Sequence, residues 1–231
     1  MIDIRPFSSL GGADHGWLKA KHHFSFANYH DPARMSWGRL RVWNDDEIGA
    51  QTGFPPHPHA DMEIITYVRT GAITHEDSMG NRGRTGAGDV QVMSAGTGVR
   101  HAEYNLEDET TTLFQIWIET DKRGAQPSWG QREFPKADRT GRFSELASGD
   151  PADEALPINA DAKVLGATLN AGETIRYPLG QGRRADLAPA VGEIEVTVVA
   201  VNARDGVAIK DEAEIVITAR ADAELVLVDA R

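Results

Sequence analysis

Short runs of β-branched and aromatic residues recur along this chain of 231 residues, with Gly, Pro, Asp or Asn between them. In the first half they are LRVWN from Leu40, MEIITYV from Met62, DVQVMS from Asp89 and TLFQIWIE from Thr112. Runs of this composition, bounded by turn residues, are typical of β-strands. Because no helix-length amphipathic pattern lies between them, the sequence predicts an all-β fold, either an antiparallel sandwich or a barrel.

The second half of the chain repeats this pattern. Its runs are AKVLGATL, ETIRYPL, EIEVTVVAVNA, GVAIK, EAEIVITA and AELVLVD. The segment from Asp121, DKRGAQPSWGQREFPKADRTGRF, is polar, rich in Gly and Pro and weakly periodic, so we interpret it as a bridge. We therefore predict two β domains, residues 1–133 and 134–231, with the boundary near Phe134.

Two segments of the first half carry turn signals. Ser78, Gly80 and Asn81 lie between two extended arms and predict a hairpin. Gly96 and Gly98 predict a turn with positive φ. The aromatic-rich stretch up to about Asn44 contains many helix-breaking residues, and we expect it to wrap around a barrel and pack on it.

The composition excludes several classes of function. Cysteine is absent, which rules out disulfides, thiolate metal sites and thiol nucleophiles. The formal net charge of −11 disfavours direct binding to nucleic acid. The first residues do not resemble a signal peptide, and no apolar run has membrane-spanning length, so we expect a soluble cytoplasmic protein that does not bind membranes.

Two pairs of potential metal ligands stand out. His57 and His59 are two residues apart, as are His101 and Glu103. Residues i and i+2 of a strand project from the same face, so two such strands facing each other would present three imidazoles and a carboxylate. This donor set suits a divalent transition metal and leaves positions open on a six-coordinate ion. All eight histidines lie at or before His101, which places any nitrogen-ligated site in the first domain.

The other histidines lack a paired spacing with a nearby acid. They are His15, His22, His23, His30 and His75. For each of them we favour ordinary hydrogen bonding over metal ligation, although His22 or His23 could support a pocket from behind the ligands. Candidates for the apolar wall of a pocket are Phe54, Met93, Tyr104 and Trp117.

The segments GFPPHPHADMEIITYV, EDSMGN and GDVQVMSAGTGVRHAEYN, with DHGWL and HFSF upstream, resemble the pirin family. The resemblance is closest to bacterial pirin-like proteins described as quercetin 2,3-dioxygenases. It is dense in the first domain and covers the second only in its strand pattern. It implies two stacked cupin-type barrels (double-stranded β-helices), with metal only in the first and none in the degenerate second barrel.

The resemblance also implies a ligand set of His57, His59, His101 and Glu103. The general cupin pattern instead places its glutamate soon after the paired histidines, where Glu63 stands. Strand parity would turn Glu63 toward the same side as those histidines, so parity alone does not exclude it. Pirins use the later glutamate, and we favour Glu103. Ala102 stands where many pirins have serine.

Two functions are compatible with such a site. The first is a dioxygenase that cleaves the heterocyclic ring of a flavonol such as quercetin with O2 and releases carbon monoxide, with Glu103 as the catalytic base. The second is a non-enzymatic regulatory protein whose metal controls binding to a protein partner. A flavonol activity could also accompany a different physiological substrate.

In each case we expect one divalent cation, with Fe(II) favoured over Mn, Ni, Co or Cu. We expect this cation to bind more weakly as the pH falls through the imidazole range. The sequence does not predict the oligomeric state.

Overall fold

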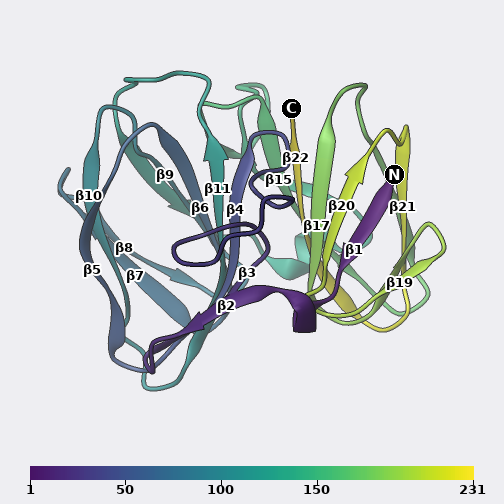
Figure 1. The fold of residues 1–231 in the computed structure, drawn as a ribbon, viewed down its shortest axis with the longest axis horizontal. Coiled ribbons are helices and arrows are strands. Elements are labelled where there is room, and N and C mark those ends of the chain that lie inside the picture. Colours follow the sequence, from purple (N-terminus) through teal and green to yellow (C-terminus); the bar gives the residue numbers. More distant parts are fainter.

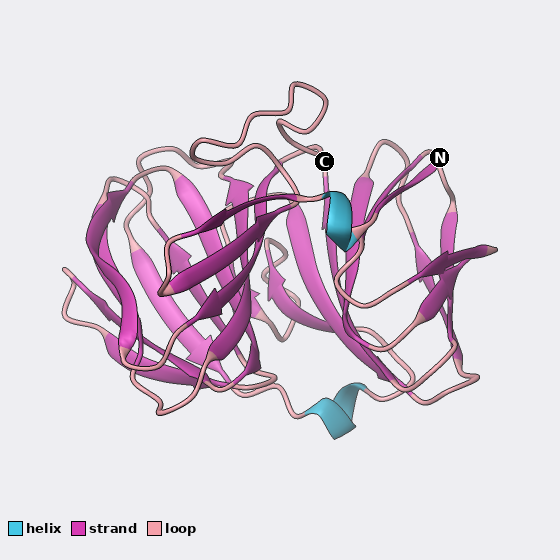
Figure 2. Ribbon diagram, turned by 60° about the horizontal axis from the view of Figure 1, so that its bottom comes forward, coloured by secondary structure: helices cyan, strands magenta, loops and turns pink.

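The computed structural model describes residues 1–231 and consists almost entirely of β-strands (Figure 1 and Figure 2). Its helices are two short 3-10 turns, η1 (Phe7–Ser9) and η2 (Lys136–Arg139). Neither has the length or the apolar character needed to cross a membrane. The strands form two barrels side by side, each built from a seven-stranded and a four-stranded sheet, so the predicted all-β architecture of two cupin barrels is confirmed.

The first barrel contains the runs predicted as strands in the first half of the chain. Its seven-stranded sheet has the order β12 (Ser128–Arg132), β9 (Val90–Ser94), β6 (Met62–Thr70), β11 (Thr111–Glu119), β4 (Leu40–Ile48), β3 (Leu18–His22) and β2 (Gly11–Asp14). Its four-stranded sheet has the order β5 (Thr52–His59), β10 (Val99–Asn105), β7 (Ala72–Asp77) and β8 (Arg82–Gly86). The hairpin predicted at Ser78 joins β7 to β8, and Gly96 and Gly98 have φ of 47° and 132° as expected.

The second barrel contains the remaining strands. Its seven-stranded sheet has the order β1 (Ile2–Arg5), β20 (Gly206–Lys210), β17 (Arg184–Val191), β22 (Ala223–Ala230), β15 (Ala162–Leu169), β13 (Ser144–Ser148) and β14 (Leu156–Pro157). Its four-stranded sheet has the order β16 (Thr174–Pro178), β21 (Glu214–Ala219), β18 (Ile194–Val196) and β19 (Val199–Val201).

Three segments differ from the simplest expectation. The first strand, β1, pairs with β20 of the second barrel, and Figure 1 shows it in purple among the green and yellow strands. The bridge from Asp121 contributes β12 to the first barrel by pairing with β9. The run EIEVTVVAVNA is not one strand but a hairpin, because the chain turns at Thr197 with a φ of 60°. The division between residues 133 and 134 stays a prediction.

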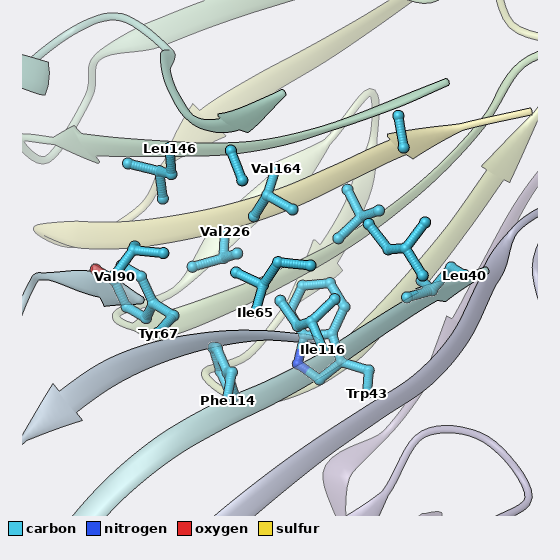
Figure 3. Close-up of a cluster of buried hydrophobic side chains, with 14 of the residues drawn as sticks. Leu40, Trp43, Ile65, Tyr67, Val90, Phe114, Ile116, Leu146, Val164 and Val226 are labelled. Atoms are coloured by element: carbon cyan, nitrogen blue, oxygen red, sulfur yellow. The ribbon is translucent and has the colours of Figure 1, made fainter. Parts of the chain in front are cut away.

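The largest apolar cluster lies between the barrels, where the two seven-stranded sheets pack against each other. Trp43, Ile65 and Ile116 of the first sheet point toward Val164 and Val226 of the second (Figure 3). The interior of the second barrel is filled by a further 18 buried apolar residues. That the second domain binds no metal stays a prediction.

The interior of the first barrel is packed differently. Its apolar side chains form only two small clusters, of 6 and 4 buried residues. Between these clusters the inward-facing positions are polar. On β6, for example, Thr66 faces inward while Ile65 and Tyr67 join the core between the barrels. Polar side chains therefore gather inside this barrel.

Candidate metal centre

The two histidine-bearing strands are direct neighbours. In the antiparallel pair of β5 and β10, His57 lies opposite His101 and His59 lies opposite Val99. The ring centroids of His101 lie 4.5 Å from His57 and 5.0 Å from His59, and those of His57 and His59 lie 4.8 Å apart. One ring nitrogen from each of the three histidines falls within a group no more than 4.8 Å across.

Hydrogen bonds orient two of these rings. The Nδ1 of His57 lies 2.8 Å from the carbonyl oxygen of Pro55, which can only accept. A neutral His57 therefore donates through Nδ1 and keeps a lone pair on Nε2. The Nε2 of His101 is buried and has no hydrogen-bond partner within the protein.

A chain of side chains behind His101 determines which of its nitrogens is free. The Nε2 of His75 lies 3.0 Å from Oδ2 of Asp77, and the Nδ1 of His75 lies 3.3 Å from the Nδ1 of His101. Although burial opposes ionisation of Asp77, hydrogen bonds from His75 and Asn81 hold the pKa of its carboxyl below the ordinary value. A carboxylate only accepts, so His75 donates to Asp77 and accepts from His101. This leaves the lone pair of His101 Nε2 directed at the other histidines.

Glu103 lies beside this cluster and is anchored by three neutral donors. Its Oε1 accepts hydrogen bonds from Thr66 at 3.1 Å and from Gln91 at 2.6 Å, and its Oε2 accepts one from Gln115 at 2.9 Å. Glu103 is 3% exposed. One of its carboxylate oxygens, as a potential metal ligand, lies within 4.8 Å of a ring nitrogen of His75 and of His101. These three hydrogen bonds fix the orientation of the carboxylate beside the imidazoles.

These donors belong to a polar row that crosses the inner face of the large sheet. The row consists of His22, Asn44, Gln115, Thr66 and Gln91, which lie opposite one another in register on β3, β4, β11, β6 and β9. Each of these polar residues takes an inward-facing position of its strand, where the pattern of the strand would place an apolar residue. These polar interruptions are the signal in the sequence from which the row could have been predicted.

The electrostatic environment favours neutral imidazoles. Burial, together with neighbouring His101 and His57, lowers the pKa of His59 to about 4. Burial, His57 and His75 lower the pKa of His101 to about 3. Neutral imidazole is the form that binds a metal ion, so both rings are ready for ligation across the physiological pH range.

The cluster opens into a cavity of about 210 Å³. Of the predicted wall residues, Phe54 and Trp117 line this cavity. Met93 lies in a small apolar cluster behind it, and Tyr104 lines a groove on the outer side of β10. The ring of Trp117 meets His59 edge to face with centroids 5.0 Å apart, which places an aromatic surface next to the imidazoles.

Glu63 lies outside the cavity. Its Oε2 is hydrogen-bonded to the hydroxyl of Ser94 on the other face of the sheet, whereas its neighbour Ile64 lines the cavity. The parity argument for Glu63 was wrong because β5 and β6 belong to different sheets. The turn between them, with a φ of 49° at Asp61, breaks the alternation of faces.

The remaining five histidines lie in four different settings. His15 and His22 line the cavity, and His75 supports His101 from behind. His23 is completely buried next to Trp43, with no hydrogen-bond partner for either ring nitrogen. His30 is exposed. His75 is hydrogen-bonded, as predicted, but one of its two partners is the candidate ligand His101, which its position in the sequence does not reveal.

The donor set and the unpartnered His101 Nε2 fit a divalent metal ion. The sequence pattern described as Pirin matches residues 4–118, and the pattern described as Quercetinase C-terminal cupin domain matches residues 145–230. A pirin-like protein of Caulobacter vibrioides is 70% identical, with both chains covered completely. The chain belongs to the pirin family.

Two further relatives of this pirin bear on its site. A protein of Escherichia coli named quercetin 2,3-dioxygenase is 42% identical, with 99% of this chain and 98% of the relative covered. The crystal structure of a bacterial pirin from Escherichia coli in complex with nickel(II) is 41% identical. It superposes with a TM-score of 0.94 over 100% of this chain and 99% of the other. The family and the donor set together indicate a divalent metal site.

Proposed function

We propose that this pirin is a metal-dependent dioxygenase that cleaves the heterocyclic ring of a flavonol such as quercetin with O2. The observation that carries the proposal is the group of three imidazoles beside Glu103, which opens into a cavity walled by Phe54 and Trp117. A relative named quercetin 2,3-dioxygenase, similar over nearly its whole length, supports the same activity.

In this proposal His57, His59, His101 and Glu103 hold one divalent cation. Imidazole and carboxylate together suit Fe(II), Mn, Ni, Co and Cu, and Fe(II) stays our prediction for the native metal. When bound, the metal would supply Lewis acidity and a template for the substrate hydroxyl and O2.

The chain's own groups would prepare the substrate. The Oε2 of Glu103 accepts a single hydrogen bond, from Gln115, whereas Oε1 accepts two. Oε2 therefore has the one lone pair that the protein leaves free. We assign this lone pair to the metal in the protein without substrate, and to the proton of the flavonol hydroxyl once the substrate is bound. The aromatic faces of Phe54 and Trp117 would orient the planar substrate and exclude water from the reacting hydroxyl.

The test combines metal reloading with a matched pair of variants. Metal-stripped protein is reloaded separately with Fe, Mn, Ni, Co or Cu, and O2 uptake and quercetin loss are measured for wild type, Glu103→Gln and Glu63→Gln. Both glutamates are buried and lie in the same barrel, but only Glu103 lines the cavity. We expect metal-dependent turnover that falls by about 100-fold or more in Glu103→Gln and by less than about threefold in Glu63→Gln.

Tight metal binding without turnover by any form would contradict the dioxygenase proposal. Equal losses in the two variants would contradict the role of Glu103. Binding of a protein partner under control of the metal stays a prediction from the sequence.

A further inference from the structure

Asp46 presents a buried carboxyl group to the cavity, and no group of the protein satisfies it. The residue lines the cavity from β4, where it lies in register between Ala20 and Leu113. It is 3% exposed, and its Oδ1 has no hydrogen-bond partner. The preceding Asp45 faces the other side of the sheet, where Arg69 and Arg204 bind it.

In the protein without a metal ion, the surroundings of Asp46 favour its protonated form. Burial, followed by the charges of Asp45 and Glu103, raises the pKa of the Asp46 carboxyl well above its ordinary value. A protonated carboxyl group can both donate and accept a hydrogen bond. An ionised carboxylate accepts a hydrogen bond, so Asp46 can bind a ligand hydroxyl in either form.

A second polar group, His22, lines the same wall one inward position away from Asp46. The Nδ1 of His22 lies 2.8 Å from Oδ1 of Asn44, which occupies the inward position two residues before Asp46. Because an amide oxygen only accepts, His22 donates through Nδ1. Burial lowers the pKa of His22, although its hydrogen bond with Asn44 acts in the opposite direction. The neutral ring keeps an acceptor on Nε2, and His22 lines the cavity.

The remaining walls suit a planar aromatic ligand. Phe26, Phe54 and Trp117 line the cavity, and the rings of Phe26 and Trp117 meet edge to face with centroids 5.5 Å apart. The cavity volume of about 210 Å³ is below the roughly 300–1,000 Å³ that encloses a drug-sized ligand. The cavity therefore encloses only part of a flavonol skeleton.

We propose that Asp46 and His22 form a subsite that binds hydroxyl groups on an aromatic ring of the substrate other than the hydroxyl that reacts. The subsite would make this pirin selective for polyhydroxylated over sparsely hydroxylated aromatic compounds. This inference rests on the proposed function for the identity of the substrate. Asp46 and His22 act in it as positioning residues, separate from the three imidazoles and Glu103.

The effect of replacing Asp46 on stability distinguishes a role in ligand binding from a purely structural role. A buried polar group without a partner destabilises the fold, and such groups persist mainly at functional sites. We therefore expect Asp46→Leu to raise the Tm of the metal-loaded protein or leave it unchanged. A purely structural aspartate would lower the Tm when replaced.

The experiment compares quercetin with 3-hydroxyflavone, which keeps the reacting hydroxyl and carbonyl but lacks the other ring hydroxyls. Both are assayed with metal-loaded wild type, Asp46→Leu, Asp46→Asn, His22→Leu and the control Glu63→Gln. We expect Asp46→Leu to lower kcat/KM for quercetin by about 10–100-fold, mainly by raising KM, and to change kcat/KM for 3-hydroxyflavone by less than about threefold. Asp46→Asn, which keeps a donor and an acceptor, should retain most of the preference for quercetin over 3-hydroxyflavone. His22→Leu should lose part of this preference.

Binding without turnover separates this inference from the proposed function. Each flavonol is titrated into metal-loaded protein under anaerobic conditions and followed by absorbance. If wild type turns over neither compound, the dioxygenase proposal fails, but tighter binding of quercetin that Asp46→Leu abolishes still supports the subsite. Equal affinity of wild type for both compounds, or equal losses on both in Asp46→Leu, would overturn it.

Discussion

The Nδ1 atoms of His75 and His101 lie 3.3 Å apart, and one imidazole thereby fixes the proton position of the other. His75 takes this role because Asp77 holds its Nε2 at 3.0 Å, and because its ring stacks on Trp129 with centroids 4.8 Å apart. A candidate ligand is thus held in the required tautomer by residues of the neighbouring strand β7. Such support behind a ligand commonly governs metal affinity.

We expect His75→Phe to weaken metal binding without unfolding the barrel. Phenylalanine preserves the stacking on Trp129 but removes the acceptor for His101 Nδ1. Loss of an outer hydrogen-bond partner of a ligand typically lowers metal affinity by about 10–100-fold. Titration of the metal-stripped protein with nickel(II) against a competing chelator measures the effect. His30→Phe, at an exposed position, is the control, and equal affinities of the two variants would refute the role of His75.

We expect Thr66→Val to destabilise the metal-free protein by about 1.5–3 kcal/mol. The hydroxyl of Thr66 donates to the buried Glu103, and valine has nearly the same shape without the donor. Thr70→Val lies on the same strand at an exposed position and should change stability by less than about 0.5 kcal/mol. Denaturant unfolding of both variants measures the difference. Equal midpoints would show that the polar row does not stabilise Glu103.

The strands, and the placement of His57 and His59 on one face of β5, could be predicted because both depend on local alternation. The sequence pattern favours two ligand-bearing strands that face each other, whereas β5 and β10 are hydrogen-bonded neighbours in one sheet. Within β5 the faces of His57 and His59 follow from their spacing alone. The same rule failed for Glu63, where the chain passes from one sheet to another through Asp61. Parity therefore holds within a strand and is lost at a turn between sheets.

The support around the site could not be predicted in this way because it depends on register between distant strands. Gln91, Thr66 and Gln115 come from three strands, and only their pairing brings them to Glu103. The placement of β1 in the second barrel likewise depends on a pairing of Ile4 with Val207. Neither partner carries a local signal for the other.

The lowered pKa values of His59 and His101 predict a loss of stability in acid for the metal-free protein. The unfolded chain binds protons at these histidines near pH 6.5, whereas the folded chain does so only near pH 4 for His59 and pH 3 for His101. Their contribution is complete above pH 6.5 and is lost as the pH falls from there toward those folded values. Denaturant unfolding at pH 7.5, 6 and 5 measures it, and His59→Gln should make the pH dependence shallower. A free energy of unfolding that rises below pH 6.5 would contradict the assignment.

Gly53 allows β5 to approach β10 closely enough for His57 to face His101. A Cβ at this position would lie 2.3 Å from the carbonyl oxygen of Glu103 and 2.5 Å from the Cα of Tyr104, which are both backbone atoms. We expect Gly53→Ala to push the strands apart, to destabilise the protein by about 1–3 kcal/mol and to weaken nickel(II) binding. Gly86→Ala in the same sheet is the matched control, since its Cβ would have its nearest contact at 3.6 Å. Unfolding midpoints and nickel(II) titrations of the two variants decide the matter. If Gly53→Ala bound nickel(II) as wild type does, the close approach of the strands would not set the geometry of the histidine cluster.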